Sequence, residues 1–183
     1  PGLGKKLENV NLLKDYLLKI KTPLVIDADA INILSENPTL ISNVPKNTIF
    51  TPHPKEFNRL VGDWQNDYSK LEMLKNFANK NGFYIILKGA YTITVTPNGT
   101  LYFNSTGNPG MATSGSGDVL TGVILSLLSQ GYLHKEACIL GVYLHGLSAD
   151  IVVQKYTSLE GLIAGDIADN LGKAFKKINT YNI

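Results

Sequence analysis

A glycine-rich stretch that runs into an apolar helical pattern, residues 104–122, constrains the fold of this chain more than any other feature. It reads NSTGNPGMATSGSGDVLTG and places Gly107, Gly110, Gly115 and Gly117 among one proline and several small hydroxyl residues. Glycine permits positive φ and lets a ligand come close to the backbone. The start of the following helix offers unpaired N–H groups and the positive end of a helix dipole at Gly115, Ser116 and Gly117. This combination predicts an anion site, most naturally a phosphate site.

Asp118 follows directly and would lie in the first turn of that helix. One interpretation is an acidic residue that stabilises the helix through its dipole by about 0.3–1 kcal/mol. The other is a catalytic base, because a phosphotransferase needs a carboxylate beside the phosphoryl group to accept a proton from the attacking hydroxyl. The four glycines ahead of Asp118 favour the catalytic interpretation.

The length of the chain fits one domain over residues 1–183 that buries a substantial core. Its net charge is +2 and it has no run of basic residues, so nothing predicts binding to nucleic acid or to a membrane surface. We also expect no apolar run long enough to span a bilayer. With one cysteine the chain cannot form an internal disulfide, which favours a reducing compartment, the cytoplasm.

The first residues form the turn Pro1-Gly2-Leu3-Gly4, and a turn of this kind normally follows a strand. We therefore expect the chain to be the latter part of a longer domain. Its N-terminal part would be missing or carried on another chain, and the sheet would then have an exposed edge.

Hydrophobic periodicity predicts an alternation of helices and strands. The expected helices cover residues 5–20, a short segment ending near 35, 55–61, 68–80, 117–128, 134–153 and 164–178. The expected strands cover residues 24–26, 49–50, 84–87, 92–96 and 100–103. The last two strands flank Pro97-Asn98-Gly99 and form a β-hairpin, since Asn-Gly between alternating runs is a strong turn signal. The whole order predicts a three-layer α/β/α fold with a mostly parallel sheet.

Polar residues follow the first three strands of this predicted sheet. Asp27 and Asp29 follow the first strand, His53 the second and Lys88 the third. The carboxyl ends of parallel strands share one edge of a sheet, where open α/β sheets bind their ligands. We therefore expect these side chains and the glycine-rich loop to converge on one cleft.

Each of these residues also has an ordinary structural interpretation. Asp27 and Asp29 are equally suited to lining the cleft and to capping the next helix. His53, held between two prolines, is balanced between ligand contact and a plain surface or core role. Lys88 is either a solvated lysine or a cation for the phosphate. Glu56, one turn after His53, would hold Mg²⁺ through water, although an exposed helix carboxylate is slightly favoured.

Three residues in the long apolar helical pattern are expected to play structural roles. Cys138 has no base nearby in sequence and is expected in the core. His134 looks like an ordinary residue at the start of a helix. His145 is expected to be packed, with one hydrogen-bond partner.

Several motifs occur in a specific order. The most discriminating are Asn108-Pro109-Gly110-Met111-Ala112-Thr113, Gly115-Ser116-Gly117-Asp118-Val119-Leu120 and Gly122. The others are Pro1-Gly2-Leu3-Gly4, Asp27-Ala28-Asp29-Ala30, Thr51-Pro52-His53-Pro54, Lys88-Gly89-Ala90 and Glu160-Gly161-Leu162-Ile163-Ala164-Gly165-Asp166. Together they resemble the ADP/ATP-dependent NAD(P)H-hydrate dehydratases of the ribokinase-like superfamily. The resemblance spans the whole chain and implies a family domain that begins well before Pro1.

The resemblance implies a repair reaction on (S)-NAD(P)H-hydrate, whose nicotinamide ring carries a misplaced hydroxyl. The enzyme would phosphorylate that hydroxyl and eliminate phosphate. Asp118 would accept the hydroxyl proton, while the amides of Gly115, Ser116 and Gly117 would stabilise charge on the transferring group. The resemblance implies that the hydrate contacts Gly2, His53, Asn108 and Asp118. It implies that the adenine nucleotide lies against Lys88, Gly89, Ala90, Tyr91, Thr92 and Gly117.

The same resemblance implies ADP or ATP as phosphoryl donor, with Mg²⁺. Bacterial members typically use ADP, and ADP is the expected donor here. It further implies a homo-oligomer, for which the hairpin is a candidate interface, and a fused or partner NAD(P)H-hydrate epimerase. Two alternatives stay open. One is a small-molecule kinase of the same superfamily, acting on a vitamin precursor or a sugar, and the other is a nucleotide-binding module without turnover.

Overall fold

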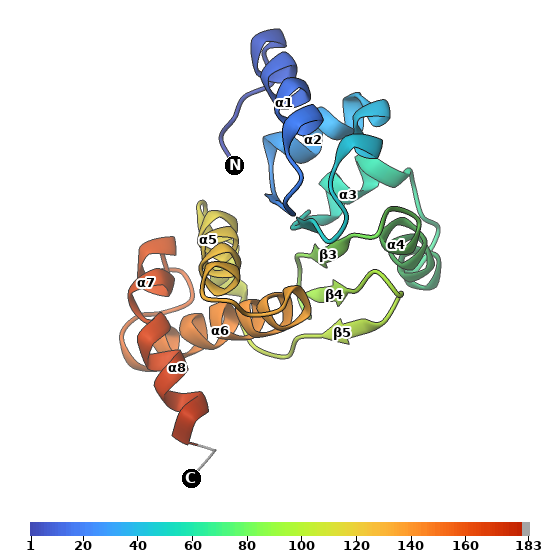
Figure 1. Cartoon of the computed structure of the whole chain (residues 1–183). Coiled ribbons are helices and arrows are strands. Elements are labelled where there is room, and N and C mark those ends of the chain that lie inside the picture. Colours follow the sequence, from blue (N-terminus) through green and yellow to red (C-terminus); the bar gives the residue numbers. More distant parts are fainter. Residues whose placement is uncertain (181–183) are drawn as a thin grey trace. The chain divides into compact units, whose positions relative to one another are not determined.

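The computed structural model describes residues 1–180, and Figure 1 shows its helices and strands, most of them labelled. The described chain divides into two compact units. The first consists of Pro1–Gly89 and Ile93–Phe103, and the second consists of Ala90–Thr92 and the chain from Asn104 onward. Each unit is described by itself below. That the two form one domain stays a prediction.

The first unit holds the sheet and four α-helices. Its elements in order are α1 (Leu7–Lys19), β1 (Val25–Ile26), α2 (Asp29–Glu36), the 3-10 helix η1 (Pro38–Asn43), β2 (Ile49–Phe50), α3 (Pro54–Val61), α4 (Asp67–Asn81), β3 (Tyr84–Leu87), β4 (Ile93–Val95) and β5 (Leu101–Phe103). The predicted strands and helices of this part are thus confirmed to within a few residues, whereas η1 was not predicted. Helix α2 ends at Glu36, and Pro38 begins η1 as its first residue, where the missing N–H of proline costs nothing.

The sheet has the order β1-β2-β3-β4-β5. The strands β1, β2 and β3 pair in parallel, with Ile26 opposite Phe50 and Phe50 opposite Ile85. The pairs β3–β4 and β4–β5 are antiparallel, so β4 alone runs against the other four strands. The predicted α/β class, the mostly parallel strand direction and the β-hairpin are confirmed. Gly99, with φ of 81°, supplies the turn of that hairpin.

The core of the first unit lies between one face of the sheet and its helices. Strand residues Ile26, Phe50 and Ile85 share this core with Phe57 of α3 and Leu74 of α4. The ring of Phe50 lies 4.9 Å from that of Phe83, and both side chains are almost completely buried. Burying one such side chain contributes about 1.5–3 kcal/mol. The strands are nearly continuous apolar runs because neighbouring residues on opposite faces, such as Ile85 and Ile86 of β3, are both buried.

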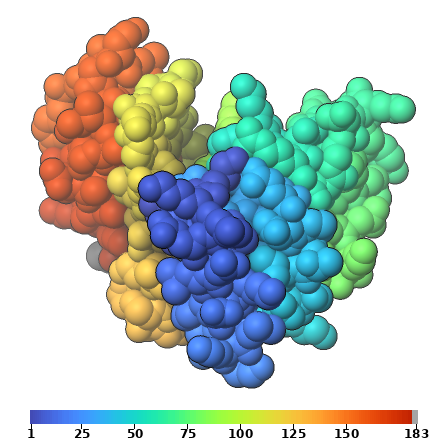
Figure 2. Space-filling view, turned by 90° about the horizontal axis from the view of Figure 1, so that it is seen from above, coloured from blue at the N-terminus to red at the C-terminus, as the bar shows by residue number. Residues whose placement is uncertain are grey.

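Helix α1 packs less completely than its sequence pattern predicts. Leu17 is buried in the core, and Leu13 packs against it partly buried. Leu7, which the helical spacing places with them, is 75% exposed, and Leu12 is also exposed. In the space-filling view of Figure 2, the dark blue N-terminal segment accordingly lies on the surface of the first unit.

The second unit is helical. Its elements are the 3-10 helix η2 (Pro109–Met111), α5 (Ser116–Ser129), α6 (His134–Lys155), α7 (Ala164–Asp169) and α8 (Leu171–Asn179). Helix α6 is central, because its residues enter three apolar groups. Ala137 packs with α5, Ala149 with α7 and Leu147 with α8. The core of this unit is therefore organised around one helix, which the sequence also predicts to be mostly apolar.

The helix predicted over residues 164–178 is two helices, and the prediction of one is wrong. Asn170 separates them with φ of −102° and ψ of 4°. Its side-chain Nδ2 donates to the carbonyl oxygen of Asp166 at 2.8 Å. Asparagine competes for backbone groups in this way, and such residues therefore favour helix ends over helix interiors.

The expectation that no apolar run could span a bilayer is also wrong by length and composition. Helix α6 has 22 residues, with a mean hydropathy of 1.4 over its most apolar window. However, 67% of that window is buried inside the protein. This burial is what the central helix of a folded core shows.

Candidate functional site

The glycine-rich loop of the second unit leads into α5 through Gly115. This residue is the N-cap, with φ of 85°, a left-handed conformation that glycine adopts without strain. No side chain among the described residues caps the helix. The Ser116 amide makes a long 3.4 Å contact with the carbonyl oxygen of Thr113, and the first amides of any helix lack intrahelical partners. Amides and helix dipole together create a site suited to an anion.

Asp118 is exposed in the first turn of α5. Its carboxylate forms no hydrogen bond or ion pair with any residue that the structure describes. The side chain is therefore not used to cap the helix or to neutralise a neighbouring cation. A carboxylate in this state, in the same helical turn as the amides suited to an anion, is available to accept a proton.

The last matched motif lies beside this loop. A Cβ atom on Gly115 would be 3.3 Å from the Cβ of Ala164, the first residue of α7. Met111 and Val119 pack against an apolar group that contains Leu162 of the same motif. Two motifs separated by some forty residues of sequence are thus neighbours in the second unit.

Asn108 engages both ends of its side-chain amide within the protein. Its Oδ1 accepts from the Gly110 amide at 3.1 Å, and its Nδ2 donates to Oδ1 of Asp150 at 2.9 Å. Oδ2 of Asp150 accepts from the Gly107 amide at 2.8 Å. Asp150 was not predicted from the sequence. The only signal for it was a carboxylate in an otherwise apolar stretch of helix, and such a residue requires polar partners. A contact between Asn108 and substrate stays a prediction.

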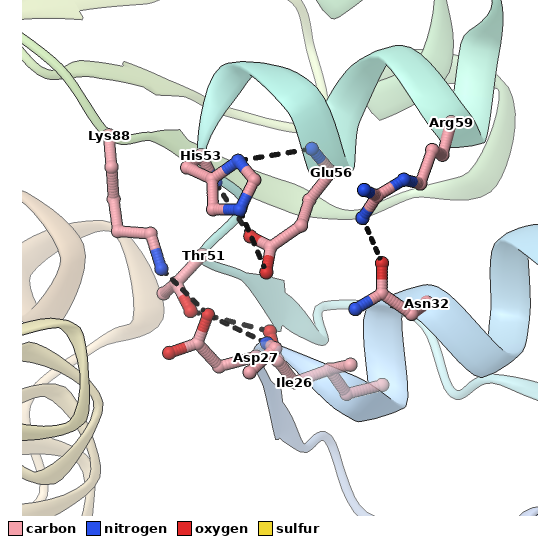
Figure 3. Close-up of polar contacts among 9 residues, drawn as sticks. Ile26, Asp27, Asn32, Thr51, His53, Glu56, Arg59 and Lys88 are labelled. Atoms are coloured by element: carbon pink, nitrogen blue, oxygen red, sulfur yellow. Dashed lines mark hydrogen bonds and ion pairs between the residues drawn. The ribbon is translucent and has the colours of Figure 1, made fainter. Parts of the chain in front are cut away.

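At the strand ends of the first unit, two predicted residues, Asp27 and Lys88, lie together with Thr51, which was not predicted (Figure 3). Nζ of Lys88 lies 2.9 Å from Oδ1 of Asp27. Asp27 is 2% exposed, and its Oδ1 also accepts from the Ala28 amide at 2.9 Å. The hydroxyl of buried Thr51, which no pattern singled out for chemistry, contacts the carbonyl oxygen of Ile26 at 3.4 Å. Lys88 is therefore a paired cation and not a freely solvated lysine.

Asp27 and Asp29 do not cap the helix that follows them. Helix α2 begins at Asp29 without a side-chain cap. Oδ2 of Asp29 instead accepts from the Gly4 amide at 2.8 Å, which anchors the N-terminal turn. Ala28 between them has φ of 50° and ψ of −118°, a strained backbone for a residue with a Cβ. Gly2 lies in the same turn, exposed and with φ of 69°.

His53 and Glu56 form a reciprocal cap at the start of α3 (Figure 3). Nδ1 of His53 accepts from the Glu56 amide at 3.2 Å, and Oε2 of Glu56 accepts from the His53 amide at 2.8 Å. Oε1 of Glu56 lies 3.4 Å from Nε2 of His53. Glu56 is 5% exposed, so the expectation of an exposed carboxylate is wrong. Both of its oxygens contact His53, and the described residues contain no group of three or more metal-ligating side chains.

The segment after β3 is exposed. Gly89 and Ala90 are both exposed, and Tyr91 is 70% exposed with φ of 55°. Thr92 is partly buried, and its carbonyl oxygen accepts from the Asn104 amide at 3.0 Å. A role of this segment in nucleotide binding stays a prediction. So does the single cleft, since the strand-end residues and the glycine-rich loop belong to different units.

The three residues of α6 that were expected to have structural roles lie in the core or at the start of the helix. Cys138 is completely buried, and burial raises the pKa of its thiol well above the ordinary value. His134 begins α6. His145 is 7% exposed, with Nε2 3.5 Å from Oγ of Ser116.

Comparison with known proteins places the chain in a family. Residues 1–173 match the family model described as NAD(P)H-hydrate dehydratase. The chain belongs to the NAD(P)H-hydrate dehydratase family. The resemblance found in its motifs is thereby confirmed.

Two curated relatives illustrate the match. The chain is 40% identical over 175 residues to the bifunctional NAD(P)H-hydrate repair enzyme Nnr of Moorella thermoacetica, covering 93% of this chain and 32% of the relative. It is also 40% identical over 172 residues to the ADP-dependent (S)-NAD(P)H-hydrate dehydratase of Neisseria meningitidis serogroup B, covering 91% and 58%. The chain therefore spans less than two thirds of the length of either relative.

Solved structures agree on the fold. The ADP/ATP-dependent NAD(P)H-hydrate dehydratase from Bacillus subtilis, co-crystallised with ATP/Mg²⁺, matches with a TM-score of 0.81 and 31% identity, covering 97% of this chain and 62% of that one. A ribokinase-like superfamily protein from Enterococcus faecalis matches with a TM-score of 0.77 and 32% identity, covering 97% and 61%. The predicted ribokinase-like fold is confirmed.

Proposed function

We propose that the protein dehydrates (S)-NAD(P)H-hydrate to NAD(P)H at the expense of a nucleotide, with ADP as the preferred donor. One observation carries this proposal: the exposed, unpaired carboxylate of Asp118 lies in the same first turn of α5 as the uncapped amides at the start of that helix. Family membership and the ADP-dependent relative support the choice of substrate and donor.

In the proposed reaction, the ring hydroxyl attacks the terminal phosphorus of the nucleotide. Asp118 accepts the hydroxyl proton as the new O–P bond forms and the bond to the nucleotide breaks. The amides of Gly115, Ser116 and Gly117 stabilise the negative charge on the transferring group. Phosphate then leaves with the electrons of the C–O bond, and loss of a ring proton restores the double bond.

Mg²⁺ would be bound at this site mainly by the phosphates of the nucleotide. Magnesium ordinarily keeps several waters and binds through one or two carboxylates together with substrate phosphates. The described residues offer no dedicated cluster for it, and Glu56 is occupied by His53. The ion would neutralise phosphate charge, while proton removal remains with Asp118.

Two further features of the proposal concern partners. We expect copies of the chain to self-associate, with the hairpin as an interface, because Phe103 of β5 is 59% exposed. The bifunctional relatives support a second activity on the same polypeptide or on a partner, which we expect to be NAD(P)H-hydrate epimerase. Both substrates are intracellular metabolites, so we expect the protein in the cytoplasm.

The decisive experiment measures phosphate release and recovery of NADH absorbance from hydrated NADH, with ADP and with ATP. Asp118→Asn should lower turnover roughly 10²–10⁴-fold and leave nucleotide affinity largely unchanged. Asp169→Asn, which alters another exposed aspartate of the second unit, serves as the matched control and should be fully active. Phosphorylation of hydroxyethylthiazole or hydroxymethylpyrimidine, with no reaction of the hydrate, would instead establish a small-molecule kinase. Equal inactivity of the wild type and of Asp118→Asn on every substrate would favour a binding module.

A further inference from the structure

One carboxylate of α6 holds the loop that leads to α5. The oxygens of Asp150 accept from two successive residues of this loop, the backbone amide of Gly107 at 2.8 Å and the side-chain Nδ2 of Asn108 at 2.9 Å. Both groups donate to the carboxylate of Asp150, which when ionised can only accept hydrogen bonds. A carboxylate with two hydrogen bonds holds the loop more strongly than a neutral acceptor does, because charge-assisted hydrogen bonds are the stronger kind.

Asn108 is also hydrogen-bonded to the residues of the loop that follow it. Oδ1 of Asn108 accepts from the Gly110 amide at 3.1 Å, and the Met111 amide donates to the Asn108 carbonyl oxygen at 3.1 Å. The Asn108 amide group therefore has a donor partner at its oxygen and an acceptor partner at its nitrogen. Its orientation is fixed, and with it the start of η2.

The loop also lies directly against the backbone of α6. A Cβ atom on Gly146 would be 2.7 Å from the carbonyl carbon and oxygen of Thr106, so a larger residue has no room there. Oγ1 of Thr106 donates to the carbonyl oxygen of Tyr143 at 2.9 Å. Gly146 and Asp150 are one helical turn apart and thus lie on the same face of α6.

The same helix contacts the first residue of α5. Nε2 of His145 lies 3.5 Å from Oγ of Ser116, and both side chains are buried. Helix α6 thereby touches both ends of the segment from Gly107 to Ser116. A change in how the loop is held on α6 would be transmitted to the amides at the start of α5.

We infer that Asp150 is a positioning residue for phosphoryl transfer: it fixes the Asn108 side chain and, through the loop, the backbone of the anion site. This inference rests on the proposed function. It assigns Asn108 to the support of the loop and not to direct contact with the hydrate.

The hydrogen-bond pattern permits a test in which the residue types at positions 108 and 150 are swapped. In Asp150→Asn, one carboxylate oxygen becomes a donor, and only one of the two loop donors keeps an acceptor. In Asn108→Asp, two carboxylates meet at hydrogen-bond distance and repel each other. In the double variant Asn108→Asp/Asp150→Asn every partner is restored. The asparagine at position 150 accepts from Gly107 and donates to the aspartate at position 108, whose second oxygen accepts from Gly110.

Three measurements on the purified protein separate the outcomes: kcat and KM for hydrated NADH, the affinity for ADP, and hydrogen exchange of the Gly107 amide. Each single variant should lower kcat roughly 10- to 100-fold with a smaller change in KM, since a misplaced site costs the transition state most. Exchange at Gly107 should become roughly tenfold faster in Asp150→Asn. The double variant should recover kcat to within roughly threefold of the wild type. Asp169→Asn is again the control and should match the wild type.

Direct contact between Asn108 and the hydrate would give a different result. The double variant would then regain slow exchange at Gly107 but would stay as inactive as Asn108→Asp, and our inference would be overturned. Unchanged kcat in Asp150→Asn would overturn it as well. If the wild type does not react with the hydrate at all, the proposed function fails. The hydrogen exchange of the Gly107 amide and the affinity for ADP then still test whether Asp150 holds the loop in place. If neither changes in Asp150→Asn, this part of the inference is rejected.

Discussion

The ammonium group of Lys88 lies 2.9 Å from Oδ1 of Asp27, so one ion pair joins the carboxyl end of β3 to that of β1 across β2. Asp27 is 2% exposed, and the side chain of Lys88 is 22% exposed. The pair closes the strand-end region of the first unit, and it leaves the Lys88 head partly accessible to a ligand.

Removal of the cation should destabilise the first unit. Lys88→Met keeps the length of the side chain but leaves the buried carboxylate of Asp27 without a counter-charge. Breaking a buried pair costs about 3–5 kcal/mol, and partial exposure of Lys88 reduces this to about 2 kcal/mol. Urea unfolding measures the change. The control Lys5→Met removes a pair with Glu36 whose side chains are about half exposed, and it should leave the unfolding midpoint unchanged. Equal effects of both variants would contradict the importance assigned to burial.

Gly115 should tolerate no side chain. Its φ of 85° costs an alanine about 1–2 kcal/mol, and the new Cβ would lie 3.3 Å from that of Ala164. Relief of this strain would move the amides of the anion site, so Gly115→Ala should lower turnover roughly tenfold or more. Gly122→Ala, an exposed position of the same helix with open space around its Cβ, is the matched control. It should keep full turnover and gain up to about 1 kcal/mol in the free energy of unfolding.

Local sequence patterns predict much of this fold because its elements are strongly periodic and clearly bounded. The run Tyr84–Leu87 is a strand as predicted, and Asn98-Gly99 marks the hairpin. The break at Asn170 was missed, because apolar spacing continues across it while one side-chain hydrogen bond ends the helix.

Around the candidate site, the sequence predicts local structure better than contacts. The glycine pattern predicts the start of a helix near Gly115 with Asp118 in its first turn, and the structure has both. The contacts of Asp150 were not predicted, because its partners are some forty residues earlier and spacing along one helix carries no information about them. Burial of Glu56 was missed for a similar reason. Its pairing with His53 replaces the solvent that a helix carboxylate ordinarily needs.

Stability should fall at alkaline pH in a way that depends on Cys138. Burial raises the pKa of this thiol above its ordinary value, so the folded state holds the proton more tightly than the unfolded state. The thiol's contribution is therefore fully present below the unfolded pKa, about 8.5, and is lost as pH rises above it, by up to about 1.4 kcal/mol per pH unit. Unfolding free energies from pH 7 to 10 should decline more steeply in the wild type than in Cys138→Ala. Parallel slopes would show that the thiol does not contribute.

The backbone strain at Ala28 should be measurable, because a substitution that relieves it should raise the free energy of unfolding. Its φ of 50° and ψ of −118° place a Cβ-bearing residue in a region that costs about 1–3 kcal/mol, between the anchored carboxylates of Asp27 and Asp29. Ala28→Gly removes this steric cost, but glycine makes the unfolded chain more flexible, which destabilises the folded state by about 0.5–1 kcal/mol. The free energy of unfolding measured with urea should therefore rise by about 1 kcal/mol in net terms. Ala30→Gly, two residues later inside α2, should instead lose up to about 1 kcal/mol. Strained residues persist where the surrounding structure holds them in place for function. A stabilised Ala28→Gly with impaired turnover would therefore tie the strain to the site, whereas a loss of stability equal to that of Ala30→Gly would refute the strain itself.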